Sequence, residues 1–283
     1  MKPESETEQI RCPCCDASRH SFWVSENGFD AVKCSSCGLI YVNPRPIRAL
    51  ITEAVQTGVH RNVAHDRTAV GRRVGAKVSR YQLIFRDFFA DIWRLKRDIS
   101  WLDVGAGFGE VVEAVTLLAT EGSKVTGIEP MKPKASDAQA RGLKVLEVYL
   151  GDVNERHDFV SLIDVFSHIP DFRKFLDDLK KVLKVNGDLF IETGDIGKLS
   201  HFRQVPSEWD LPDHLVFAGE QNMVDYLTSA GFEIVKIEKR RVDGLETFAK
   251  NIAKKILGRQ VNLSLPYSSP YRTMLIRARL VKE

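Results

Sequence analysis

The sequence predicts an α/β protein, in which an open parallel sheet carries helices on both faces and a small ribbon precedes the sheet. Three observations lead to this prediction. From residue 101 to residue 193, apolar runs of strand length alternate with stretches whose apolar residues recur at helical spacing. The first apolar run passes directly into a glycine-rich turn, and two pairs of cysteines lie near the N-terminus.

The composition is that of an ordinary globular protein. The chain has 283 residues, of which 43% are hydrophobic and 28% charged, so it is long enough for one large domain and an appendage. A net charge of +3 identifies neither a nucleic acid nor a membrane as partner. No apolar run approaches the roughly 18 residues of a spanning helix, and residues 1–9 are acidic. We therefore expect a cytoplasmic protein without a membrane partner; the oligomeric state is left open.

Four of the five cysteines form two C-x₂-C knuckles, Cys12 with Cys15 and Cys34 with Cys37, separated by eighteen residues. Two such knuckles can complete a tetrahedral shell of thiolates with no position left for water, so we expect them to hold a structural zinc ion. Cys14 is expected to be a bystander, because Cys12 with Cys15 keeps the spacing of the second pair. The alternatives, free thiols or a disulfide framework, are disfavoured in a cytosolic setting.

Residues 1–45 are expected to comprise a disordered start and the zinc ribbon. Residues 1–9 are polar and predicted to be disordered. Short strands are predicted over residues 20–24 and 29–33, with a final strand over 39–42. Pro44 and Pro46 then make a rigid exit, because proline cannot continue a strand ladder, and this segment is a natural domain boundary.

Residues 46–98 are expected to form a helical connector or lid. Two interpretations of residues 49–80 stay open: a solvated connector, or a lid that closes over a ligand and meets an anionic substrate such as a phosphate. Residues 81–93 place apolar side chains on one helical face and are predicted to pack on the sheet. The basic residues of the connector are His60, Arg61, His65, Arg67, Arg72, Arg73, Lys77 and Arg80.

The glycine-rich turn lies between a predicted strand that ends at residue 104 and a predicted helix over 110–118. Glycine permits a tight turn and a close approach of the backbone to a ligand, and the helix N-terminus offers free N–H groups. A dinucleotide site requires G-x-G-x-x-G, but here the third glycine comes one residue early and Glu110 takes the place reserved for it. This spacing argues against NAD.

The form D-x-G-x-G-x-G resembles the first motif of class I S-adenosylmethionine-dependent methyltransferases. The resemblance implies a Rossmann-like, seven-stranded methyltransferase sheet over residues 99–283, with Asp103 near the methionine moiety of the cofactor. A Cys₄ ribbon that runs into residues 38–46 ahead of this motif is similar to a group of bacterial sugar and natural-product methyltransferases. The turn residues expected to line the cofactor are Gly105, Ala106, Gly107, Phe108 and Gly109.

Further binding residues are expected at the ends of the next two strands. The predicted strand over 123–128 ends in Glu129 and Pro130, where an acid about twenty residues beyond the glycines accepts ribose hydroxyls. A third strand is predicted over 142–148, and Asp152 and Val153 follow it. The resemblance implies that Asp152 faces the adenine amino group; a simple turn aspartate is the alternative.

Two histidines are candidate general bases. His168 follows the predicted strand over 159–166, at the sheet edge where ligands bind, within a His-apolar-Pro-Asp pattern that resembles the family. Ser167 precedes it where the family more usually has glutamate, so that residue's role is not carried over. His214 is the second candidate, with Asp213 or Asp210 orienting it. Either histidine could instead hold its loop by hydrogen bonds.

The remainder of the sheet and its insertion complete the prediction. A helix over 172–183 and a strand over 189–193 follow His168, and a further helix begins near residue 219. Residues 231–238 and 272–281 alternate as strands and are expected to end the sheet in antiparallel order. Between them lies a basic amphipathic helix over 245–257, with three roles open: covering the active site, binding a partner or capping the sheet.

The predicted function is methyl transfer from S-adenosylmethionine to a small molecule or glycan, with oxygen as the acceptor atom. One alternative is an RNA methyltransferase that uses the zinc ribbon for docking, although the ribbon lacks a dense basic cluster and nucleic acid is not favoured. The other is a non-enzymatic interaction protein that binds the cofactor. No acidic or histidine cluster is expected beyond the ribbon, so a magnesium-dependent mechanism is not predicted.

Overall fold

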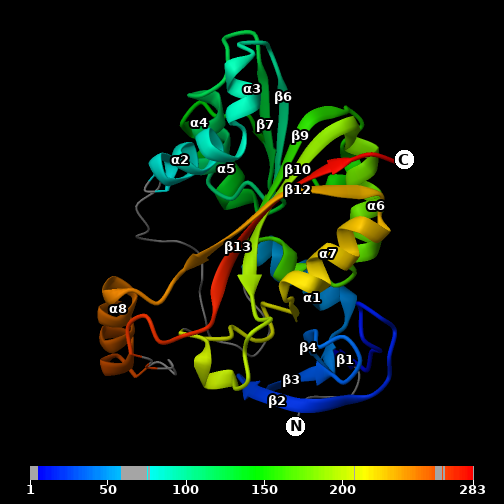
Figure 1. Cartoon of the computed structure of the whole chain (residues 1–283), viewed down its shortest axis with the longest axis vertical. Coiled ribbons are helices and arrows are strands. Elements are labelled where there is room, and N and C mark those ends of the chain that lie inside the picture. The colour runs from blue at the N-terminus through cyan, green and yellow to red at the C-terminus, as the bar shows by residue number, and fades with distance from the viewer. Residues whose placement is uncertain are drawn as a thin grey trace.

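A seven-stranded sheet forms the centre of the protein in the computed structural model, which describes residues 6–58, 75, 77–206, 208–258, 263 and 265–282 (Figure 1). Its strands are β6 (Ser100–Val104), β7 (Lys124–Ile128), β8 (Val145–Leu146), β9 (His157–Ile163), β10 (Leu183–Asp195), β12 (Phe232–Arg241) and β13 (Arg272–Leu280). They lie in the order β12-β13-β10-β9-β6-β7-β8. The neighbouring strands β10, β9, β6, β7 and β8 all pair in parallel. Strand β13 is antiparallel to both β10 and β12. The predicted seven-stranded sheet and its antiparallel ending are confirmed.

Helices cover both faces of this sheet, as predicted (Figure 1). On one face lie α2 (Val78–Phe88), α3 (Ala90–Arg94), α4 (Glu110–Thr116) and α5 (Lys132–Ala140), and on the other lie α6 (Phe172–Val182) and α7 (Glu220–Ser229). Alternation along β6 explains the two layers, because successive strand side chains point to opposite faces. Trp101 packs against Phe85 of α2, whereas Leu102 belongs to the cluster that contains Leu176 of α6.

The predicted aromatic helix is part of the core. Phe85 and Phe89 are fully buried, and both make edge-to-face contacts with the Trp101 ring, at centroid distances of 5.1 and 5.0 Å. The Trp101 indole N–H donates to Ser161 Oγ over 2.9 Å, so its polar atom is satisfied inside the core. These aromatic side chains hold α2 on the sheet directly behind the glycine-rich turn.

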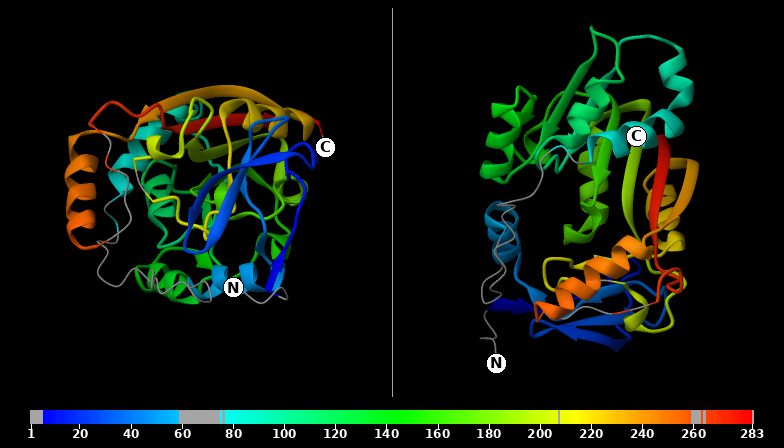
Figure 2. Two further views of the ribbon diagram at one scale, coloured as in Figure 1. Left: turned by 90° about the horizontal axis from the view of Figure 1, so that it is seen from below. Right: turned by 90° about the vertical axis from the view of Figure 1, so that its left-hand side faces the viewer.

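The cysteine ribbon contains the predicted strands β2 (His20–Glu26), β3 (Phe29–Cys34) and β4 (Ile40–Val42). A fourth strand, β11 (Val216–Phe217), comes from the other end of the chain and pairs with β4 in antiparallel order, which the sequence did not indicate. The ribbon lies beyond the carboxyl ends of the large sheet (Figure 2). Its sheet therefore joins two distant segments of the chain.

Outside the two main sheets, the structure corrects one prediction and leaves another outside the described residues. Within the predicted disordered start, Thr7 and Glu8 form β1, which pairs with β5 (Arg45–Pro46); Arg45 also binds the Glu8 carboxylate. The basic residues His60, Arg61, His65, Arg67, Arg72 and Arg73 lie outside the described residues. Two further helices are α1 (Arg48–Thr57) and α8 (Leu245–Ile256).

None of the helices in the described ranges combines the length and hydropathy that crossing a bilayer requires.

Candidate active site

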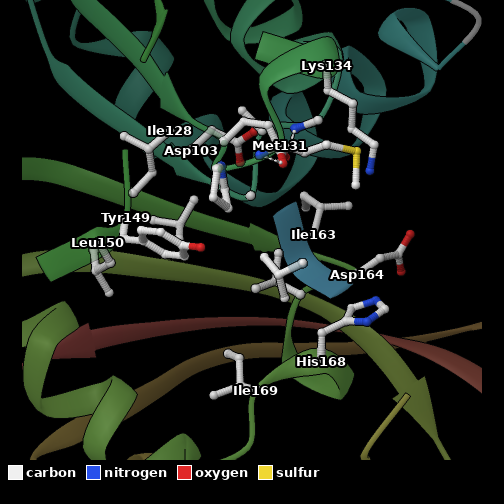
Figure 3. A pocket seen from close by; sticks show the side chains of 18 of the residues that line it. Asp103, Ile128, Met131, Lys134, Tyr149, Leu150, Ile163, Asp164, His168 and Ile169 are labelled. Atoms are coloured by element: carbon white, nitrogen blue, oxygen red, sulfur yellow. Dashed lines mark hydrogen bonds between the residues drawn. The ribbon is translucent and has the colours of Figure 1, made fainter. Parts of the chain in front are cut away.

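A cavity of about 610 Å³ opens at the carboxyl ends of β6, β7 and β9 (Figure 3). In α/β sheets this is the edge where ligands bind. Asp103 and His168 lie on different sides of the cavity, with Tyr149 and Leu150 to one side (Figure 3). The predicted cofactor residues that line it are Asp103, Gly105, Ala106, Gly107, Phe108, Glu129 and Pro130.

The three glycines of the turn have different structural roles. Gly105, Gly107 and Gly109 all adopt positive φ angles, of 72°, 55° and 78°, a conformation that favours glycine. A Cβ on Gly105 would lie 2.6 Å from the Val165 side chain, and one on Gly109 would lie 2.7 Å from Leu143. A Cβ on Gly107 would meet no atom within 4 Å. Gly105 and Gly109 thus permit close packing, while Gly107 presents its backbone to the open cavity.

Glu129 fixes the turn to the end of β7. Its buried carboxylate accepts a hydrogen bond from the Gly107 N–H over 2.8 Å and another from the Met131 N–H over 2.9 Å. A carboxylate has about four lone-pair positions, so these two bonds leave acceptor capacity on an acid that lines the cavity. Glu129 is therefore placed to accept hydroxyl groups from a ligand.

Asp103 is held in a buried chain of hydrogen bonds. The Ser161 hydroxyl donates to its Oδ1 over 2.6 Å, and Ser161 in turn accepts from Trp101. Burial, opposed by the Ser161 hydrogen bond and assisted by the Glu129 charge, raises the pKa of Asp103 to about 7. A carboxyl group with so perturbed a pKa, in a cavity, is characteristic of functional sites.

Three of the predicted cofactor residues lie outside the cavity lining. Gly109 is covered by packing, whereas the exposed Asp152 ends the 3₁₀ turn η2 (Leu150–Asp152) and Val153 directly follows it. The Asp152 carboxylate accepts from the Tyr149 N–H over 3.1 Å and so closes this turn. Val148, Tyr149 and Leu150 line the cavity instead. The adenine-binding role of Asp152 stays a prediction.

The fold brings the two candidate bases together. His168, at the end of the 3₁₀ turn η3 (Phe166–His168), lies with its ring centroid 4.8 Å from that of His214. The Leu215 N–H donates to the Ser167 carbonyl oxygen over 2.7 Å, which ties the two loops to each other. Asp213 also lines the cavity, as predicted for an orienting acid, whereas His214 lies behind His168 and outside the lining.

Both imidazoles are oriented by carbonyl oxygens. His168 Nδ1 lies 2.9 Å from the Asp213 carbonyl oxygen and 3.5 Å from its carboxylate, and His214 Nδ1 lies 3.1 Å from the Trp209 carbonyl oxygen. Because a carbonyl oxygen can only accept, each Nδ1 carries the hydrogen and each Nε2 is the acceptor of the neutral ring. His168 therefore has a basic nitrogen available on the ring that lines the cavity.

The two histidines have opposite pKa shifts. Burial disfavours the charged form of His168, but the hydrogen bond and negative charge of Asp213 outweigh burial and raise its pKa. Burial and the charge of His168 lower the pKa of His214. His168, Asp213 and His214 also offer three ligand atoms within 4.8 Å of one another. No such group beyond the cysteines was predicted, because these residues meet only through the fold.

Helix α1 forms a cavity wall that the sequence did not reveal. Arg48, Ile51, Thr52, Ala54 and Val55 of α1 all line the cavity. Ile51 and Ala54 share one face of α1 and are buried, which is the periodic signal that could have marked this face. Part of the predicted connector therefore lies over the same cavity as the glycine-rich turn.

The four predicted metal ligands converge in the ribbon. Cys12 Sγ lies 3.5 Å from Cys37 Sγ, Cys15 Sγ lies 3.6 Å from Cys34 Sγ, and all four sulfur atoms lie within 4.8 Å of one another. Tetrahedral Zn–S bonds of about 2.3 Å correspond to sulfur separations of about 3.8 Å, so the thiols fit a zinc ion. Cys14 lies outside this group; its sulfur is 3.9 Å from the Asn222 side-chain nitrogen.

The chain matches a known protein family and part of a curated relative. A family model described as a methyltransferase domain matches residues 77–237. A ubiquinone biosynthesis O-methyltransferase of Actinobacillus pleuropneumoniae serotype 5b (strain L20) is 30% identical over 106 residues, which are 32% of this chain and 44% of that protein. The chain thus spans less than half the length of this curated relative.

Solved structures share the fold at low sequence identity. A candidate sarcosine dimethylglycine methyltransferase from Galdieria sulphuraria is 17% identical with a TM-score of 0.53, over 71% of this chain and 85% of that one. The cyclase SpnF is 19% identical with a TM-score of 0.51, over 69% of this chain and 79% of that one. Proteins with this fold therefore include one named for a chemistry other than methyl transfer.

Proposed function

Because the chain belongs to the methyltransferase-domain family, we propose that it transfers a methyl group from S-adenosylmethionine to an oxygen atom of a small-molecule acceptor. One observation carries the proposal: the glycine-rich turn, the buried acid Glu129 and a histidine with a basic Nε2 all line one cavity. The O-methyltransferase relative supports oxygen as the acceptor atom. A hydroxylated natural product or glycan is the acceptor class that we propose.

The cofactor is assigned to the side of the cavity formed by β6 and β7. Gly107, where a side chain would project into open space, leaves the backbone accessible to a ligand, and the adjoining Glu129 carboxylate accepts the ribose hydroxyls. Asp103 would hold the methionine moiety, and Tyr149 and Leu150 would supply the apolar wall for the adenine. When bound, S-adenosylmethionine supplies an electrophilic methyl group.

The chain's own part in the reaction is orientation and proton transfer. The Asp213 carbonyl oxygen holds the His168 ring with Nε2 as its basic atom, so His168 takes the proton of an acceptor hydroxyl. His214, with its lowered pKa, stays neutral beside it and does not repel the imidazolium that forms. The α1 wall limits access of water to the cavity.

We assign the four-cysteine group to a structural zinc ion. All four positions around the metal would be taken by thiolates, so the ion stabilises the ribbon and has no place for a substrate. We propose three parts of the chain: the start and the zinc ribbon over residues 1–45, a helical connector or lid over 46–98, and a cofactor-binding domain over 99–283.

Calorimetry with the zinc-loaded protein tests cofactor binding. We expect S-adenosylmethionine and S-adenosylhomocysteine to bind the wild type, and Glu129→Gln to weaken both by about tenfold, the order of a charge-assisted hydrogen bond. Glu147→Gln, an exposed acid on the same sheet edge, is the matched control. A well-folded wild type that binds neither compound would refute the proposal.

Transfer itself requires a separate measurement, because a shared fold does not fix the chemistry. Cofactor with a labelled methyl group is incubated with panels of hydroxylated metabolites and glycans. Label in an acceptor, lost in His168→Asn, supports methyl transfer with His168 as the base. Cofactor binding without transfer to any acceptor would instead favour the non-enzymatic alternative.

A further inference from the structure

Helix α8 is oriented in the opposite sense to an ordinary surface helix. The side that faces the protein is mainly polar apart from the half-buried Phe248: Asn251 is only 5% exposed, and its side-chain nitrogen donates to the Pro206 carbonyl oxygen over 2.6 Å. Lys254 lies on the same side, 3.8 Å from the Glu208 carboxylate. A helix that only capped the sheet would bury its apolar residues instead.

Most of the apolar residues of α8 point to solvent, whereas Phe248 is half-buried. Leu245, Ala249, Ile252 and Ile256 follow one another at intervals of four, three and four residues, so they form one stripe along the helix, here called the α8 stripe. Leu245 is 66% exposed, Ile252 38% and Ile256 80%. Burial of such side chains stabilises a complex strongly, so a stripe of this kind marks an interaction surface.

The exposed apolar residues continue beyond the helix. Of the sixteen large apolar side chains that are exposed in the described residues, seven belong to this one insertion between β12 and β13. The Tyr267 ring lies beside Gly244, at the start of α8, and its backbone is fixed by hydrogen bonds to Arg241 and Asp243. The insertion stands out from the side of the large sheet (Figures 1 and 2).

The positive charges beside the α8 stripe favour an anionic partner. Lys250 and Lys255 are exposed on its two flanks, and the last turn of α8 is basic. The single acid of the helix, Glu246, already forms an ion pair with Lys250 over 2.5 Å. A second copy of α8 would bring lysines toward lysines, whereas an anionic surface would complement them.

We propose that α8 docks the protein on the surface of an anionic lipid bilayer, with the α8 stripe entering the interface and the lysines meeting the headgroups. An amphipathic helix of twelve residues lies in the plane of such an interface and does not cross it. Docking revises the expectation from the sequence that no membrane is a partner. It does not depend on the proposed methyl transfer, because no cavity residue takes part.

Vesicle co-sedimentation of the full chain tests the proposal. The probes are vesicles of phosphatidylcholine alone and of phosphatidylcholine with phosphatidylglycerol. We expect the wild type to sediment with the anionic vesicles, and added salt to release it. Ile256→Asn should lower the partition coefficient about tenfold, since one buried apolar side chain is lost. Lys255→Glu should lower it by about fivefold or more on the anionic vesicles only.

Leu83→Asn is the matched control, because Leu83 is 67% exposed on α2, away from the insertion, and its loss should leave sedimentation unchanged. Equal melting temperatures establish that the variants fold. The proposal is overturned if the wild type does not sediment with anionic vesicles, or if Ile256→Asn sediments as the wild type does. It is also overturned if sedimentation velocity without lipid shows a dimer that Ile256→Asn dissociates, because the stripe would then join two copies.

Discussion

His168 and His214 differ in protonation although their rings are neighbours. Burial acts on both in the same direction, but the hydrogen bond and charge of Asp213 outweigh burial at His168, whereas burial and the charge of His168 outweigh the Asp213 charge at His214. As the pH falls, His168 therefore becomes protonated before His214. A general base must be neutral before it can accept a proton, so the raised pKa of His168 makes the base stronger and moves its working range to higher pH.

Asp213→Asn should shift the pH profile of turnover. Removal of the carboxylate removes the charge that raises the pKa of His168, so that pKa falls and the acidic limb of kcat/KM moves to lower pH. The measurement is kcat/KM against pH with an acceptor that accepts the labelled methyl group. His168→Asn should lower kcat by about 10²- to 10⁴-fold at all pH values.

Asp177→Asn removes an exposed acid from α6 and is the control that should leave the profile unchanged. An acidic limb that stays in place in Asp213→Asn would mean that His168 is not the titrating base. A limb that moves while kcat is retained in His168→Asn would assign the proton transfer to another group.

Sequence could predict the residues whose placement depends on local structure. Asp103 and Glu129 could be predicted because Asp103 lies near the end of β6 and Glu129 directly follows β7, and parallel strands end at one edge. The contact of His168 with His214 could not be predicted, since it depends on pairing between β4 and β11. Asp152 was assigned by resemblance, and its carboxylate closes a turn instead of lining the cavity.

At the scale of elements, strand lengths follow from partners that are distant in sequence. The predicted strand over 142–148 is reduced to β8, because it lies at the sheet edge and only Val145 is buried there. The predicted strand over 189–193 extends over all of β10, since β9 and β13 bind it from both sides. Asn186 and Gly187 lie within a register shift of β10, between Leu183 and Asp188. Local patterns predicted the kind of most elements but not β1 or β11, and the ends of the elements depended on their neighbours.

A buried charge cluster joins β13 to β10 and α3. Arg277 is 4% exposed and donates to the Asp188 carboxylate of β10 and to the Asp91 carboxylate of α3. Arg279 donates to Asp188 from the same strand. Each buried charge is compensated, so the cluster specifies which strand lies beside β10.

Arg277→Met should destabilise the protein by about 3 kcal/mol, because it leaves the buried Asp188 with less of its compensating charge. The measurement is the free energy of unfolding in urea. Arg279→Met, at a side chain 37% exposed, should cost about 1 kcal/mol or less. Equal costs for the two variants would show that burial does not set the strength of this cluster.

At the scale of the whole molecule, the ribbon is attached to the side of the cavity that carries His168. The Arg45 guanidinium donates to the Pro170 carbonyl oxygen over 2.6 Å, just after His168, and Asn222 of α7 donates to the Cys37 carbonyl oxygen over 3.0 Å. The other side, formed by the turn after β6 and by Glu129, has its own contacts within the large sheet. Disorder in the ribbon should therefore reach the two sides of the cavity unequally.

Removal of zinc should reduce turnover more than cofactor binding. Chelation takes away the ion that would hold the ribbon, so the loops of His168 and His214 lose a support while Glu129 keeps its bonds. Metal content, calorimetric affinity and turnover are measured on the same samples. Cys12→Ser should behave like the chelated protein, and Cys14→Ser should keep its zinc. Unchanged turnover after complete removal of zinc would contradict this coupling.

The order of strands also determines when a growing polypeptide can fold. Strand β13 lies between β10 and β12 although it follows both in the sequence, and β4 waits for β11, which lies far along the chain. During synthesis, β10 and β4 therefore expose backbone edges until these later segments have emerged from the ribosome. A chaperone that shields such edges would have its greatest effect in this interval.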